Sequence, residues 1–101
     1  MTQYSETPAI PGKVLEHQFL KPLKVSQSQL ARDIDVPRTR IVEIIHGQRA
    51  ITADTALRLA TYFDTDPLYW LTLQTKYDLH CTIRDRGDEI KQRIRQLKSV
   101  A

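Results

Sequence analysis

The chain has few of the residues that build disulfides, sharp turns or membrane spans. It contains one cysteine, Cys81, and three glycines among its 101 residues. A single cysteine cannot form an internal disulfide, which is typical of proteins in a reducing compartment. No apolar run approaches the ~20 residues that a helix needs to cross a bilayer, and the N-terminus lacks the basic and apolar regions of a signal peptide. These absences predict a cytoplasmic protein with no membrane partner.

Side-chain groups that could hold a metal or perform catalysis are also missing from the sequence. The three histidines fall in different expected elements, and only His80 adjoins another possible ligand, Cys81. A structural zinc site needs four ligands at a recognisable spacing. The sequence has no glycine-rich phosphate loop, and Cys81 has no set of His and Asn or Asp to activate a thiol. We therefore expect no metal, no cofactor and no enzymatic activity.

The charge that is present lies mostly at one end of the chain. The net charge is +3, yet residues 1–83 hold nine basic and nine acidic side chains and are neutral as a group. The excess comes from residues 84–98, where six basic side chains accompany three acidic ones. A nucleic-acid partner is allowed but not required by this charge, and a body that binds DNA must use a local basic edge.

Apolar side chains recur at helical spacing, and no alternating run bounded by turn residues predicts a sheet. Helices are expected at residues 11–20, ending before Pro22, and then after the capping or helix-opening residues Ser26, Pro37, Thr52 and Asp66. With 41% apolar residues the chain can bury a modest core. The sequence therefore predicts an all-α fold, with five helices in one compact domain.

The C-terminal segment is expected to add one more helix. A break near Gly87 precedes Ile90, Ile94 and Leu97, which repeat at four and three residues. This stripe is too narrow for a helix that is stable alone, so it needs a partner surface. The domain's own body, a second subunit and another protein are all candidates.

Residues 26–47, SQSQLARDIDVPRTRIVEIIHG, carry the most information about function. Ser26 is a good helix cap, and Gln29 three residues later can complete a capping box. Asp35 stands where the chain must reverse, in a left-handed backbone that aspartate tolerates better than most residues. Gly47 closes the second helix. The segment thus predicts two short helices joined by a tight turn. In a helix-turn-helix, this arrangement presents the second, reading helix to the DNA major groove.

The second of these helices has a polar face of unusual composition. With Ile41 at the centre of the buried face, a rotation of about 100° per residue turns outward Thr39, Val42, Glu43 and His46, with Arg38 and Arg40 on the flanks. Arginine can donate two hydrogen bonds to guanine, glutamate can accept one from cytosine, and valine or threonine can contact a thymine methyl group. The alternative is an ordinary solvated face, on which His46 simply caps its helix.

Two further residues are candidates for phosphate contacts. Gln27 opens the first helix beside its free N–H groups, and Arg49 follows Gly47. The full set expected to bind DNA is Gln27, Arg38, Thr39, Arg40, Glu43 and Arg49.

Segments covering residues 10 to 79 resemble the HigA family of antitoxins, also called virulence-associated protein I. They are IPGKVLEHQFLKPL, VSQSQLA, VPRTRIVEIIHGQRAITADTALRLATYF and DPLYWLTLQTKYDL. Residues 26–47 also resemble the helix-turn-helix of phage-repressor-like, XRE-type domains, to which they align without gaps and in which SQxxLA opens the first of the two helices. The segments ITADTALRLA and YWLTLQTKYDL are distinctive of the antitoxins. Lys24 and Asp35 replace glycines that are common at the two turns. We expect a flexible lead at residues 1–9, the DNA-binding domain at 10–79 and a charged segment at 80–101.

The resemblance implies a partner as well as a ligand. A HigA-like protein would neutralise a HigB-like, RelE-type toxin that cleaves mRNA, and would repress their shared operon by binding a palindromic operator as a homodimer. The alternatives are a stand-alone phage-type repressor without a toxin, and an interaction module that no longer binds DNA.

Aromatic residues in the last part of the domain are candidates for a dimer seam, because a monomer of this size has limited interior. Tyr69, Trp70 and Tyr77 are assigned to that seam. For Trp70 the simpler interpretation is that it belongs to the core.

Overall fold

Helices form all the regular secondary structure of residues 7–98, the part of the chain that this computed structural model describes. In order they are α1 (Pro11–Val14), η1 (Leu15–Leu20), α2 (Lys21–Leu23), α3 (Gln27–Asp33), α4 (Arg38–Ile45), α5 (Ala53–Phe63) and α6 (Pro67–Arg93). The first three are continuous, so the described residues form five helical rods, and the all-α prediction is confirmed. Most of the lead expected at residues 1–9, and the last three residues of the chain, lie outside the described residues.

The first rod extends further than the sequence suggested. The sequence predicts that it ends before Pro22, but it continues to Leu23 and ends at the cap residue Lys24, whose φ is +57°. Proline lacks an N–H and its ring crowds the carbonyl four residues earlier. The six residues of η1 are wound as a π-helix, in which the Lys21 N–H donates to the Glu16 carbonyl five residues back. This wider winding carries the rod past the proline.

The predicted caps are confirmed at three helix starts. The Ser26 hydroxyl accepts from the Gln29 N–H at 3.0 Å, and the Thr52 hydroxyl accepts from the Thr55 N–H at 3.3 Å. The Asp66 carboxylate accepts from the Leu68 N–H at 2.9 Å, with proline at the first helical position. The sequence predicts that Pro37 opens the next helix, but it is the cap residue, and α4 begins one residue later at Arg38.

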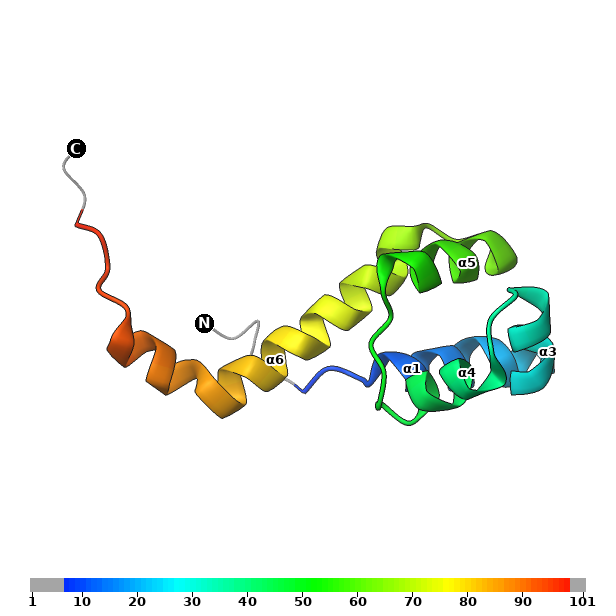
Figure 1. Cartoon of the computed structure of the whole chain (residues 1–101), viewed down its shortest axis with the longest axis horizontal. Helices are drawn as coiled ribbons and strands as arrows, with labels where there is room; N and C mark the ends of the chain where they lie inside the picture. The colour runs from blue at the N-terminus through cyan, green and yellow to red at the C-terminus, as the bar shows by residue number, and fades with distance from the viewer. Residues whose placement is uncertain (1–6, 99–101) are drawn as a thin grey trace.

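The core lies where the first rod, α3, α4, α5 and the first turns of α6 meet (Figure 1). Each of them contributes fully buried side chains, among which are Leu15, Leu30, Ile41, Ile44, Leu59 and Trp70. Helix α1 lies directly on the backbone of α4. A Cβ atom added to Gly12 would overlap the Ile44 carbonyl and stand 2.5 Å from the Ile45 Cα. Only glycine allows this approach, which sets the position of α4 against the first rod.

Helix α6 is continuous through Gly87, so the break predicted there is wrong. One glycine inside a helix costs about 1 kcal/mol relative to alanine, less than two helix ends would cost. Ion pairs one turn apart support this part of the helix, since Glu89 lies 3.3 Å from the Nε of Arg86 and 3.6 Å from that of Arg93. The boundary expected at residue 80 also falls inside this helix.

The second half of α6 extends away from the helical body (Figure 1). At 1.5 Å per residue its 27 residues span about 40 Å, in a molecule 55 Å long. The helix ends at Arg93, so of the predicted stripe only Ile90 lies on it: Ile94 is the extended cap residue, and Leu97 follows the helix. None of the described helices is long and apolar enough to span a membrane.

Candidate nucleic-acid interface

Four residues, 34–37, connect α3 to α4 and set the angle between them. The Asp35 N–H donates to the Arg32 carbonyl at 3.2 Å, and the Val36 N–H donates to the Ala31 carbonyl at 3.0 Å. With Asp35 in the left-handed region at φ +58°, this pattern is a Schellman closure of α3 without glycine. The left-handed residue predicted at this turn is confirmed. Residues 26–47 thus form the two helices and tight turn of a helix-turn-helix.

Helix α4 presents the basic residues that the sequence assigned to DNA. Arg38 and Thr39, in its first turn, are exposed, and Arg40 is half-buried. Ile41, Ile44 and Ile45 hold the opposite face in the core. Within residues 7–98, neither Arg38 nor Arg40 has an ion-pair partner within 4 Å. The two guanidinium groups are therefore available for an external anion.

The far end of α4 is built differently. The Nε of Arg49 lies 2.8 Å from the Oε1 of Glu43, and both side chains are about half exposed. Gly47, at φ +76°, donates its N–H to the Ile44 carbonyl, and the chain turns back so that the two charges meet. Two residues for which the sequence predicts separate contacts with DNA thus form one ion pair. A carboxylate on a DNA-facing helix repels phosphate, and the arginine offsets that repulsion.

Gln27 is the first residue of α3 and is half-buried. Its position after the Ser26 cap places it beside N–H groups that no helix carbonyl can satisfy. Both the position and the N–H groups suit a phosphate contact.

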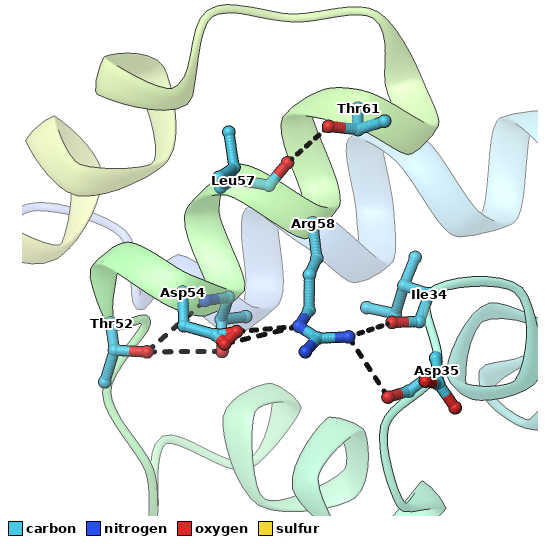
Figure 2. Close-up of polar contacts among 8 residues, drawn as sticks. Ile34, Asp35, Thr52, Asp54, Leu57, Arg58 and Thr61 are labelled. Atoms are coloured by element: carbon cyan, nitrogen blue, oxygen red, sulfur yellow. Dashed lines mark hydrogen bonds and ion pairs between the residues drawn. The ribbon is translucent and has the colours of Figure 1, made fainter.

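Sequence reasoning missed the residues that hold the turn from outside. Arg58 of α5 donates from Nη1 to the carbonyls of Ile34 and Asp35, at 2.7 and 3.1 Å (Figure 2). Its Nε donates to the Asp54 carboxylate at 2.7 Å. A second link lies nearby, where the Tyr62 hydroxyl donates to Asp33 at 2.8 Å. The only signal in the sequence is an arginine between two leucines of α5, with an acid four residues before it.

These contacts change the ionisation of both partners. The hydrogen bond from Arg58, aided by its charge and by that of Arg40, holds the pKa of Asp54 below its ordinary value of 3.8. The same hydrogen bond and the Asp54 charge raise the pKa of Arg58. Both groups are therefore charged at neutral pH.

The three residues assigned to a dimer seam do not share one environment. Trp70 is fully buried and donates from Nε1 to the Thr65 hydroxyl at 2.9 Å, so it has no surface to give to a second copy. Tyr69 is 38% exposed, and Tyr77 is half-buried. The apolar side chains further along α6 are open to solvent, so the body of the chain does not cover the C-terminal stripe.

No group of three or more His, Cys, Asp or Glu side chains within residues 7–98 is arranged to hold a metal ion. The geometry that the described residues do offer is a capped helix, a tight turn and a basic helix face on a small α-helical body. This fold and site define a helix-turn-helix protein.

Comparison with known proteins places the chain more narrowly. The helix-turn-helix family model matches residues 17–70. Virulence-associated protein I of Dichelobacter nodosus is 48% identical over 83 residues, which cover 81% of this chain and 77% of the relative. Antitoxin HigA-1 of Vibrio cholerae is 30% identical over 91 residues, which cover 90% of this chain and 86% of the relative.

A solved structure gives the same result in three dimensions. It is the antitoxin HigA of Pseudomonas aeruginosa with the higBA promoter, which matches with a TM-score of 0.86 and 36% identity, over 90% of this chain and 99% of that one. The chain belongs to the HigA family of helix-turn-helix antitoxins. The family consists of DNA-binding proteins rather than enzymes, which agrees with the prediction from the sequence.

Proposed function

We propose that the chain is the antitoxin of a toxin–antitoxin pair, and that it binds the operator of its own operon as a homodimer. In this role it represses transcription and neutralises a HigB-like toxin that cleaves mRNA. The observation that carries the DNA half of the proposal is the basic first turn of α4, where Arg38 and Arg40 have no ion-pair partner among residues 7–98. The solved relative bound to its promoter supports the same role.

In the proposed complex the first turn of α4 enters the major groove, as recognition helices of this motif do. Arg38 and Arg40 contact bases, and Thr39 lies beside them. Gln27 and Arg49 contact phosphates on either side of the groove, with Glu43 held by Arg49. Residues 1–83, which include this edge, are neutral as a group, so binding depends on a few side chains rather than on a broad positive field.

The DNA half is tested by a gel-shift titration on the protein's own promoter at several salt concentrations. R38A or R40A should weaken promoter binding by ~1–3 kcal/mol if the residue contacts a base. Q27A should weaken binding to promoter and random DNA by similar factors, because phosphate contacts carry no sequence information. R95A, outside the helical body, is the matched control. Promoter binding that is insensitive to salt and to these substitutions would refute the assignment.

The antitoxin half is tested by co-expression with the product of the neighbouring reading frame. Co-purification of the two proteins and relief of growth arrest are the expected results. If the chain binds its promoter but neither binds nor neutralises the neighbouring product, it is a stand-alone repressor instead.

A further inference from the structure

The turn between α3 and α4 leaves two carbonyl groups that its own helices do not use. The N–H groups of Asp35 and Val36 close α3 onto the carbonyls of Arg32 and Ala31. The carbonyls of Ile34 and Asp35 come after the last turn of α3, at the negative end of its dipole. A cation fits this position.

Arg58 occupies that position from a helix more than 20 residues away in the sequence. Its Nη1 donates to both carbonyls, at 2.7 and 3.1 Å, and Figure 2 shows the guanidinium lying between Asp54 and the turn. The Nε end of the group is held by the Asp54 carboxylate, at 2.7 and 3.3 Å from its two oxygens. A planar guanidinium can make all these bonds at once, whereas a lysine ammonium at the end of a flexible stem cannot.

Asp54 holds the arginine from its own helix. It lies one turn before Arg58 on α5, and its pKa is lowered mainly by the hydrogen bond from Arg58, with a smaller contribution from the charge of Arg40. The first two turns of α5 therefore hold the turn through Arg58, and Asp54 fixes the guanidinium in place.

We propose that Arg58 is a positioning residue for DNA reading, because it fixes the backbone of the turn and so the angle at which α4 meets the groove. The inference rests on the proposed operator binding and deepens it. Asp35 is a non-glycine residue at φ +58°, a backbone conformation that tends to relax. Without Arg58 the turn loses the two hydrogen bonds from Nη1 that oppose this relaxation. The reading helix would then keep its charge but lose its register with the bases.

The experiment compares R58K and R58M with the matched control R86K, which changes an exposed arginine in a one-turn ion pair far along α6. Affinity is measured for the promoter fragment and for random DNA of equal length, each over a range of salt. Both Arg58 variants should lose about tenfold in promoter affinity, the loss expected when one base contact is no longer made. Affinity for random DNA should change less than about twofold, and the salt slope should not change, because no phosphate contact is removed.

A direct phosphate contact by Arg58 would give a different pattern. R58K would then keep its promoter affinity, while R58M would lose affinity for both DNAs and its salt slope would fall by about one. That pattern overturns the inference, and so does an unchanged ratio of promoter to random affinity in both variants. If the wild-type chain itself shows no preference for its promoter, the proposed operator binding is wrong. A wild-type preference that the Arg58 variants leave unchanged contradicts only the role of Arg58.

A milder variant covers the case in which the Arg58 variants do not fold. D54N keeps the arginine but weakens the bond that holds its Nε, so promoter preference should fall in the same direction by a smaller factor. Amide exchange in the DNA-free protein gives a second readout. Exchange at Asp35 and Val36 should speed up in D54N relative to amides of α5, and unchanged exchange together with unchanged promoter preference would overturn the inference.

Discussion

Replacing Gly12 with alanine should destabilise the protein by moving the reading helix off the first rod. The added Cβ would overlap the Ile44 carbonyl and stand 2.5 Å from the Ile45 Cα, where ordinary van der Waals contact begins at 3.4 Å. Both obstacles are backbone atoms, so no side chain can rotate out of the way. Helices α1 and α4 must separate by roughly 1 Å, a form of overpacking that typically costs ~1–3 kcal/mol.

The net effect follows from two opposing contributions. Alanine is favoured over glycine in a helix by up to ~1 kcal/mol. Because the clash is with backbone, we take the upper end of the overpacking range, which leaves a loss of ~2 kcal/mol. For a domain of this size such a loss should lower Tm by about 10 °C. Promoter affinity should also fall, because the displaced helix is the one that carries Arg38 and Arg40.

Thermal unfolding followed by circular dichroism checks this prediction, with G87A as the matched control. A Cβ at Gly87 would meet only the Ile83 side chain, whose Cγ2 lies at an ordinary 3.5 Å. The control should therefore be as stable as the wild type or more stable, by up to ~1 kcal/mol. A Gly12 variant that melts within about 2 °C of the wild type would refute the reasoning, since it would show that the backbones can separate at no cost. Equal losses in both variants would point to a general effect of removing glycine.

Three further outcomes are expected. R49A should weaken binding to all DNA and lower the salt slope by about one, whereas E43A should strengthen binding to random DNA. Because the Glu43–Arg49 pair is exposed, either substitution should change the free energy of unfolding by less than ~1 kcal/mol. Asp54 has a folded pKa below 3.8, so its pairing with Arg58 stabilises the protein at neutral pH, and this stabilisation is lost as pH falls below that value. The acid unfolding curve of D54N should lack this loss of stability, and a curve identical to that of the wild type would contradict the pairing. S26A should cost ~1 kcal/mol in unfolding free energy through loss of the α3 cap, and a fully stable variant would show that the cap is dispensable.

The sequence predicted the parts of the fold that depend on local chemistry. Ser26 caps α3 and Asp35 takes a left-handed backbone because both preferences reside in the residue itself. The predicted end of the first rod was wrong because a π-helix carries it past Pro22. The predicted break at Gly87 was wrong because one glycine inside a helix costs less than two helix ends. Both predictions used the preference of a single residue, and the surrounding helix overrides that preference.

The candidate site could be predicted only in part, for a related reason. The polar face of α4 follows from helical periodicity, and the structure places its residues where the periodicity put them. The role of Arg58 could not be predicted, since its partners at the turn are backbone carbonyls 23 and 24 residues away, which leave no mark on side-chain identity. The pairing of Glu43 with Arg49 needed the turn at Gly47, whose geometry periodicity does not describe.

The projecting half of α6 has a consequence for how unfolding of this protein should be measured. A lone helical arm held mainly by its own turns unravels gradually and not in one cooperative step, because a short isolated helix is only marginally stable in water. The far-ultraviolet signal at 222 nm should therefore slope before the main transition, whereas the fluorescence of the buried Trp70 should report only the body. If a second copy covers the arm, the slope should shrink as protein concentration rises, and the two probes should then converge.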